Sequence, residues 1–307
     1  MKTKSVFFSV LLVCCFLIGV SNQKLIFSSD TLLKYKRRKI TYVSASGISS
    51  VSGLVALNEL WYKAYPRNSF HFFNDNSEWF QMDKFGHCYS SYQLGRISYS
   101  AMKWAGFNDN KALYLGGISG SIYLSMIELM DGFSDGWGFS TGDLLANFSG
   151  STFFIVQQKI WNEQKVLCKF SFHRTNYPSY RPEILGSNVS QEFFKDYNGQ
   201  SYWLSFNLKS LFFPDTKFPS YMNFALGFGA DGMLSANRDY IILKSDGTII
   251  GQNSRRNFFI SLDIDLTRIK TKSKFLKYLF SVLNSVKVPF PALELSKSGV
   301  QSHLLYH

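Results

Sequence analysis

The sequence contains few cysteines. Four occur in 307 residues, and two of them, Cys14 and Cys15, lie in an apolar segment near the N-terminus. The other two, Cys88 and Cys168, could form one disulfide, but neither has a second metal ligand at Cys-x-x-Cys spacing. This scarcity excludes zinc fingers and iron–sulfur clusters, and we expect two buried thiols. We predict no metal and no cofactor.

Acidic residues are also in the minority, with 21 Asp and Glu against 33 Lys and Arg, and the formal net charge is +12. A surface of this sign attracts anionic lipid, acidic polymers or nucleic acid. Aromatic residues make up 17% of the chain, which suits either a membrane interface or an aromatic core. We expect membrane lipid or a lipid-linked envelope polymer as the partner, and no nucleic acid. The composition leaves the oligomeric state open.

The N-terminus has the features of a secretory signal peptide. Two lysines within Met1–Lys4 precede an apolar run from Val6 to Val20, which is short for a membrane span of roughly 20 residues. We predict a signal peptide over residues 1–21 and an exported protein of the bacterial cell envelope, in the periplasm and associated with a membrane. Two alternatives stay open. One is lipidation at Cys14 or Cys15, and the other is an uncleaved anchor, which the basic run 34–39 favours.

The mature chain divides into a helical half and a strand-rich half, and we predict an α+β fold. An N-terminal four-helix, glycine-rich bundle is expected over residues 40–163, and a β-rich region packed on it over residues 164–307. The helices are expected at about 41–65, 82–105, 110–131 and 141–161. Small residues such as Gly116 and Gly120 would let the helix backbones approach closely, in a membrane or in a compact soluble bundle.

The second half alternates large apolar residues with small or polar ones, which is the period of a β-strand. The alternation is clearest at 202–208, 222–231 and 257–266, and turn residues predict hairpins at 240–250 and 292–306. Outer-membrane strands alternate in the same way, but several of these segments are shorter than the roughly 9 to 11 residues of a span. We therefore predict a curved antiparallel β-sheet with one amphipathic helix.

That helix is expected at about 272–286, with its apolar residues on one side. Four lysines cluster at its start: Lys270, Lys272, Lys274 and Lys277. A basic amphipathic helix of this kind binds an anionic membrane surface. The alternative is a helix that packs on the core and exposes a solvated basic end, and the sequence does not decide between the two.

Polar residues interrupt the apolar helices of the first half, where they are expensive unless they are paired or used. They are Asp83, His87, Glu128, Asp131, Asp143 and Asn147. Asp83 and His87 are four residues apart and share a helix face, so the carboxylate could orient the imidazole. If the helices pack antiparallel, the four carboxylates and His87 could converge at one end of the bundle, and together with Asn147 they are the expected ligand-binding residues.

The spacing Asp83-Lys84-x-x-His87, followed by Glu128-x-x-Asp131 and Asp143-x-x-x-Asn147-x-x-Gly150, resembles that of VanZ-like membrane proteins. The chain is more similar to the YfiM-like predicted periplasmic lipoproteins of Bacteroidetes-type bacteria, a domain family of unknown function. The segments that carry this second resemblance are 58–63, 70–75, 131–134, 195–200 and 229–233. VanZ-like proteins usually carry Gln at the position of Asp131 and an Arg in the following loop, and this chain departs from both. The resemblance implies an envelope location and this fold, and no established reaction.

Two functions fit these observations. We favour a non-enzymatic envelope protein that binds lipid or a lipid-linked envelope polymer through the polar cluster. The alternative is an envelope hydrolase or transferase in which His87 is the general base, Asp83 orients it, and Glu128 or Asp143 is a second acid–base group. No serine stands in a nucleophile-elbow context between a strand and a helix. A purely structural role, in which these residues cap helices and pair between them, is also open.

Overall fold

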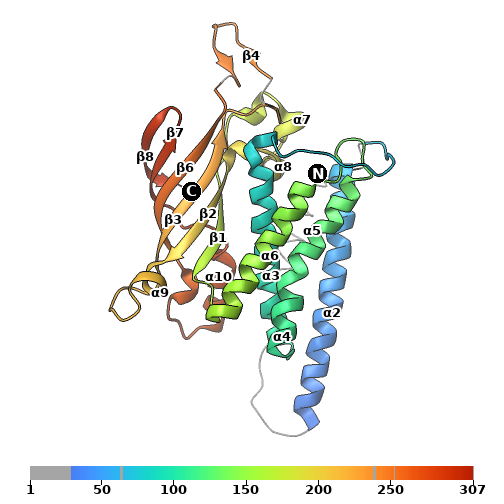
Figure 1. The fold of residues 1–307 in the computed structure, drawn as a ribbon, viewed down its shortest axis with the longest axis vertical. Helices are drawn as coiled ribbons and strands as arrows, with labels where there is room; N and C mark the ends of the chain where they lie inside the picture. The colour runs from blue at the N-terminus through green and yellow to red at the C-terminus, as the bar shows by residue number, and fades with distance from the viewer. Residues whose placement is uncertain (1–28, 63–64, 238–239, 252, 307) are drawn as a thin grey trace. The chain divides into compact units, whose positions relative to one another are not determined.

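The computed structural model describes residues 29–62, 65–237, 240–251 and 253–306, and the fold is α+β. The chain forms two compact units (Figure 1). The helical unit consists of the residues up to Asn74 together with Ser90–Ile160, and the strand-rich unit consists of Asp75–Tyr89 and Trp161–His307. The predicted signal peptide, with Cys14 and Cys15, lies outside the described residues.

Long helices make up most of the helical unit. They are α2 (Ser29–Leu57), the part of α3 (Met82–Trp104) that follows Tyr89, α5 (Gly117–Asp131) and α6 (Thr141–Trp161). A π-helical turn, η1 (Asn58–Tyr62), ends α2, and the short α4 (Asp109–Lys111) and η3 (Ala112–Gly116) run into α5. The bounds of α3 and α6 agree with the predicted helices to within one residue, whereas α2 begins earlier than predicted because the basic run 34–39 consists largely of good helix formers. The four-helix bundle stays a prediction.

Glycines bring the helices of this unit close together. A Cβ atom at Gly95 would lie 2.5 Å from the carbonyl oxygen of Gly117, and one at Gly120 would overlap the carbonyl oxygen of Ser91. The same approach buries hydroxyl groups. Ser91 Oγ donates to the carbonyl oxygen of Asn147 (2.6 Å), as does Ser121 Oγ (2.7 Å). Polar side chains therefore lie at the contacts between these helices, where small residues make room for them.

The strand-rich unit is built on one antiparallel six-stranded sheet. Its strands, in spatial order, are β1 (Val166–Phe172), β2 (Gln200–Asn207), β3 (Met222–Asp231), β6 (Arg255–Ile264), β7 (Phe290–Ser296) and β8 (Gly299–Tyr306). A small hairpin of β4 (Ile242–Leu243) and β5 (Ile249–Ile250) separates β3 from β6. The amphipathic helix is α10 (Lys274–Leu283). The antiparallel sheet and both hairpins agree with the prediction, but β1 was not predicted.

Short helices that the sequence did not predict fill the connections of this unit. They are η4 (Tyr177–Ser179), α7 (Pro182–Leu185), α8 (Val189–Lys195), η5 (Tyr197–Gly199), α9 (Leu208–Phe212) and η6 (Leu266–Arg268). Side-chain caps begin several of them: Asn188 for α8, Asn207 for α9 and Asp265 for η6.

One face of the sheet, here called the inner face, carries buried charged and polar groups beside the aromatic rings of Trp203 and Phe259. Lys169 on β1 and Asp263 on β6 form an ion pair of 2.8 Å, and both side chains are 0% exposed. Lys169 Nζ also donates to the carbonyl oxygen of Ile264 (2.7 Å), and Ser205 Oγ donates to Asp263 Oδ2 (2.6 Å). Trp203 shares this face, where Gly227 on β3 leaves room for its ring. Every charge in this part of the interior therefore has hydrogen-bonded partners, as burial requires.

The opposite, outer face is apolar and is partly covered by residues 75–89. This segment contains η2 (Glu78–Gln81) and the first turns of α3. The Phe85 ring stacks on Phe228 with centroids 4.4 Å apart, and Tyr89 packs against Phe170 and Tyr202. Phe80 and Met82 complete the buried cluster. The cover extends over parts of β1, β2 and β3, so the beginning of α3 belongs to the sheet.

We predict that replacing Asp263 by Asn lowers the free energy of unfolding by about 3–5 kcal/mol, because it leaves the buried Lys169 ammonium without a counter-charge. Denaturant titration of the full chain in detergent measures this change. Asp246→Asn, at an exposed turn between β4 and β5, is the control and should be close to neutral. Equal stability of the two variants would contradict the assignment.

Candidate functional site

The end of α5 and the start of α6 are joined through Glu128. This carboxylate is 2% exposed, and its Oε2 accepts a hydrogen bond from the backbone N–H of Ser140 (3.3 Å). Ser140 Oγ in turn accepts from the backbone N–H of Asp143 (3.1 Å), so Ser140 caps α6. Glu128 thus holds the residue that begins the next helix, and it acts as a positioning group for this end of the unit.

Asp131 is more accessible than Glu128 and is bound by a tyrosine. Tyr62, in the π-helical turn after α2, donates from its hydroxyl to Asp131 Oδ1 (2.7 Å). Burial and then the nearby charge of Asp131 raise the pKa of Tyr62 far above its ordinary value, so the tyrosine stays protonated and keeps donating. The Tyr62 ring also packs edge-on against Trp137 at 5.5 Å. The sequence prediction did not name Tyr62 as a site residue, although the segment 58–63 that contains it carries the family resemblance.

Asp143 and Asn147 lie one turn apart on α6, and both are buried. The backbone oxygen of Asn147 accepts from Ser91 and Ser121, which ties α6 to α3 and α5. These contacts are the kind expected of residues that hold helices together.

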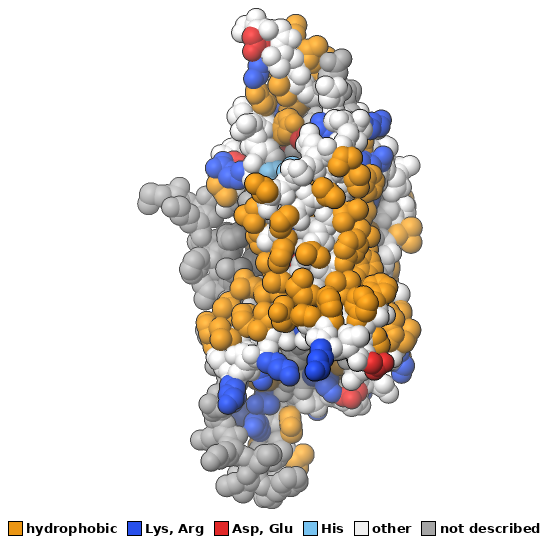
Figure 2. All heavy atoms as spheres, turned by 90° about the vertical axis from the view of Figure 1, so that its left-hand side faces the viewer, with side chains coloured by type: hydrophobic (Ala, Val, Ile, Leu, Met, Phe, Trp, Pro, Cys, Tyr) orange, Lys and Arg blue, Asp and Glu red, His pale blue; other side chains and the backbone are white. Residues whose placement is uncertain are grey.

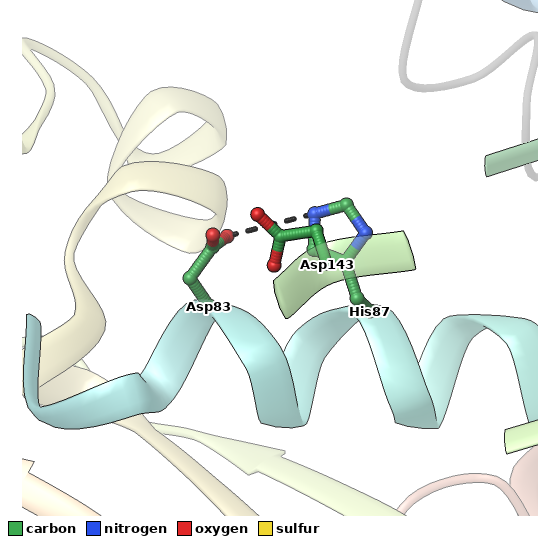
Figure 3. A group of neighbouring side chains, drawn as sticks. All are labelled: Asp83, His87 and Asp143. Atoms are coloured by element: carbon green, nitrogen blue, oxygen red, sulfur yellow. Dashed lines mark ion pairs between the residues drawn. The ribbon is translucent and has the colours of Figure 1, made fainter. Parts of the chain in front are cut away.

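Asp83 and His87 form a pair in the first turns of α3, within the strand-rich unit (Figure 3). Asp83 Oδ1 lies 3.7 Å from His87 Nε2 and accepts from the Tyr197 hydroxyl at 2.9 Å. Burial acts to raise the pKa of Asp83, but the charges of His87 and Lys84 and the donated hydrogen bonds outweigh it, so this pKa lies below its ordinary value. Asp83 is therefore an ionised partner for the imidazole.

The six predicted residues thus fall into two groups. Asp83 and His87 pair in the strand-rich unit, whereas Glu128, Asp131, Asp143 and Asn147 belong to the helical unit. Within the helical unit, Glu128 reaches the N-terminal cap of α6, and Asp131 reaches the turn that follows α2. The convergence of all six into one site stays a prediction.

Two loops, one of which directly follows Asp131 in the chain, bring four aromatic rings together. The backbone of the loop that contains His71 pairs with the loop after α5, through His71 N–H to Gly132 (2.9 Å) and Phe139 N–H to His71 (3.0 Å). The four rings of Phe70, Phe72, Phe133 and Phe139 pack against one another with centroid separations of 5.3–5.6 Å. Phe70, Phe72 and Phe133 are nevertheless exposed. We call these four residues the aromatic loop cluster; exposed rings next to a carboxylate suit the headgroup region of a membrane.

The amphipathic helix α10 exposes much of its apolar side. Phe275 is 71% exposed, Leu279 and Leu283 are exposed too, and Leu276 and Phe280 are half-buried. Both interpretations of α10, as a core-facing helix and as a membrane-surface helix, stay predictions. Lys274 and Lys277 lie on the helix, and Lys270 and Lys272 precede it. Their role at a membrane surface stays a prediction, but the exposed apolar side is what such a role requires.

A row of aliphatic side chains crosses the outer face of the sheet where residues 75–89 do not cover it. Leu204 faces Leu226, Leu226 faces Ile260, and Ile260 faces Leu293, so the row spans four strands. These four side chains are between 37% and 48% exposed. Phe258, Leu262 and Leu295 flank the row and are also exposed. We call these seven residues the apolar sheet face.

Basic residues border this face at one end. Lys209 and Lys217 lie between β2 and β3, and Lys270 and Lys272 follow β6. Because Asn207 pairs with Asn223 and Met222 pairs with Ile264, these connections meet at the same end of the sheet. Figure 2 shows the result as a broad hydrophobic band with Lys and Arg side chains directly below it. Monomeric soluble proteins rarely expose a continuous apolar surface of this kind.

Sequence comparison gives one match. Residues 71–159 match the model of a family described as "Predicted periplasmic lipoprotein (DUF2279)". The match agrees with the exported, cell-envelope location expected from the sequence, and it does not extend to the YfiM name or to the VanZ-like motif. Comparisons with curated proteins and with solved structures gave no match. The matched segment includes all six predicted site residues and runs through parts of both units.

We predict that Asp83 stabilises the protein above about pH 4 and that this contribution is lost as the pH falls. Its pKa is lower in the folded than in the unfolded state, so protonation favours unfolding. The free energy of unfolding of Asp83→Asn should therefore vary less between about pH 5 and pH 2 than that of the original chain. Asp215→Asn, an exposed aspartate of the same unit, should retain the full dependence. Identical pH profiles for Asp83→Asn and the original chain would refute this role.

Proposed function

We propose that the protein is a membrane-associated protein of the cell envelope that binds lipid or a lipid-linked envelope polymer. The observation that carries the proposal is the apolar sheet face, an exposed aliphatic row across four strands with basic residues along one end. Hydrocarbon chains remove such side chains from water, and lysines at the border lie where anionic headgroups are. The exposed apolar side of α10 belongs to the same unit and supports the same partner.

The helical unit supports membrane association independently. Leu32–Leu57 and Asp109–Asp131 are long and apolar enough to cross a membrane, with mean hydropathies of 1.4 and 1.3. Core helices of soluble proteins and signal sequences can pass the same test. However, the first stretch has none of its most apolar window buried, and Ile40, Val43 and Ile48 are exposed along it. At the same time, Ser91, Ser121 and Ser151 are buried between helices. Apolar groups outside and hydroxyl groups inside are the arrangement of a helix cluster in lipid.

The polar cluster would bind the head of the ligand. Asp131 is the accessible carboxylate, Tyr62 holds it, and Glu128 and Ser140 fix the adjacent helix start. An ionised carboxylate can accept hydrogen bonds but has none to donate. It therefore selects an ammonium or a hydroxyl group rather than a phosphate. The aromatic loop cluster beside it would contact the apolar part of the same molecule. Asp83, His87, Asp143 and Asn147 complete the proposed set as residues that pair with or support these elements.

A hydrolase or transferase is the second candidate. The distance of 3.7 Å between Asp83 and His87 is the one observation that favours it, since an ionised carboxylate beside an imidazole raises its basicity. In this alternative His87 is the general base, with Glu128 or Asp143 as a further acid–base group. His87→Gln would then abolish turnover of an envelope substrate by protein that is still folded.

We predict that the full chain, carrying a C-terminal tag, stays in the membrane pellet after an alkaline carbonate wash. The apolar sheet face and the exposed side of α2 would both have to leave hydrocarbon to be released. Immunoblotting of pellet and supernatant measures the distribution. Recovery in the supernatant as a soluble protein would overturn membrane embedding.

We predict further that labels on the apolar sheet face contact lipid. In reconstituted protein whose native cysteines are replaced by serine, nitroxides at Leu226→Cys and Ile260→Cys should collide with oxygen and avoid a water-soluble nickel complex. Leu243→Cys, on the exposed hairpin strand β4, is the matched control and should show the reverse. Nickel accessibility equal to that of the control at both positions would remove the observation on which the proposal depends.

We predict that Asp131→Ala weakens binding of phosphatidylethanolamine by about tenfold, because it removes the accessible carboxylate that would accept from the ammonium group. Native mass spectrometry of the detergent-solubilised chain measures lipid retention. Asp135→Ala, an exposed loop aspartate four residues away, is the control. Equal retention by both variants would exclude Asp131 as the headgroup ligand.

A further inference from the structure

A cavity of about 170 Å³ lies within the strand-rich unit, on the inner face of the sheet. Gly229 on β3 opens its floor, since a Cβ atom there would lie 3.1 Å from Ser201 Oγ and 3.2 Å from the Phe259 ring. Its walls come from β3, β6, β7 and β8, and the exposed Gln301 stands among them. The volume corresponds to about five water molecules. That is less than the roughly 300 Å³ at which sites for drug-sized ligands begin.

Two polar atoms in this cavity have no partner. Among the described residues, none donates a hydrogen bond to Asn257 Oδ1, and none accepts from Arg255 Nε, although both atoms are buried. Asn257 is only 7% exposed. The two residues are two positions apart on β6, so they face the same side of the sheet. An unpaired acceptor and an unpaired donor on the same face of one strand are complementary to a ligand that both donates and accepts.

The charges that line the cavity are paired with each other. Arg255 binds Asp231 at 2.9 Å, and His303 Nε2 lies 2.8 Å from Glu294 Oε2 across the β7–β8 hairpin. An ionic ligand would therefore find no unpaired opposite charge in the cavity. The free energy that it loses on leaving water would not be offset by a new ion pair. These contacts favour a neutral ligand.

The remaining wall is aromatic. Tyr306 and Phe259 pack with ring centroids 4.4 Å apart, and the Tyr306 hydroxyl lies 3.0 Å from Ser201 Oγ. Ring faces of this kind cover the C–H side of a small ring while amide and carboxylate groups bind its edge.

We propose that this cavity binds one neutral sugar ring, such as a single residue of an envelope polysaccharide. Hydroxyl groups of a pyranose supply both the donor that Asn257 Oδ1 lacks and the acceptor that Arg255 Nε lacks. Asp231 and Glu294 accept from further hydroxyls, and Tyr306 covers one face of the ring. The proposal does not depend on membrane association, because every residue that it uses lies on the inner face of the sheet.

Saturation-transfer NMR on the full chain in detergent tests the proposal, with methyl glucoside and methyl N-acetylglucosaminide as separate probes. At least one should bind at millimolar concentration. Gly229→Val, which fills the cavity, and Asn257→Leu, which removes the unpaired acceptor, should each weaken binding about tenfold or more.

Gln301→Ala is a further test in case the buried variants fail to fold. Gln301 is an exposed residue of the cavity wall, so its replacement should not disturb folding. This variant should weaken glycoside binding severalfold. Ser302→Ala, the next residue on β8 and outside the cavity lining, is the matched control and should bind normally. Absence of binding by both glycosides to folded protein would overturn the proposal. So would binding that Gln301→Ala and the folded cavity variants leave unchanged, or binding of inorganic phosphate that Gly229→Val abolishes.

Discussion

Asp263 lies near two buried lysines on the inner face of the sheet. It pairs directly with Lys169, and its charge also acts on Lys287, whose pKa burial lowers to about 8. Charged groups stay in a protein interior only with partners of this kind, so the ion pair holds β1 and β6 to inner positions at which both charges are buried. Successive strand residues point to opposite faces, so Leu262, next to Asp263 on β6, faces outward. The exposed row from Leu204 to Leu293 lies on that outer face.

The helical unit follows the same rule with a different geometry. Its helices meet at glycines and serines, and the hydroxyl groups of Ser91 and Ser121 satisfy a backbone carbonyl of α6. Leucine, isoleucine and valine along α2 are left on the outside. In water this arrangement would expose apolar surface, whereas in lipid both the apolar and the polar groups would be satisfied. The stability of such a unit would therefore depend on its surroundings as well as on its internal contacts.

The sequence predicted those parts of the fold in which one period dominates. Alternation located β3 and β6, and the apolar run of α6 gave both of its ends. Strand β1 was missed because its polar residues, Lys169 and Ser171, are buried and therefore do not mark a solvent-facing side. In the site, the Asp83–His87 pair was predictable from a spacing of four. Tyr62 and Asp131 are 69 residues apart, and Glu294 and His303 meet across a hairpin, so only the tertiary fold brings each pair together. The exposure of α10 could not be predicted from the sequence either. An amphipathic pattern shows which side of a helix is apolar, but not what that side contacts.

The strand-rich unit is discontinuous in the chain, and this constrains the order of folding. The strands pair in sequence order, each with its predecessor in the sheet, so the sheet can grow as a meander from β1 onward. Residues 75–89 are synthesised before any of these strands, yet Phe85 and Tyr89 have their packing partners on β1, β2 and β3. This segment can pack on the sheet only after the residues from Ser90 to Ile160 and the strands that follow them have been synthesised. The first turns of α3 are thus a late step in assembly, and no single cut in the chain separates one intact unit from the other.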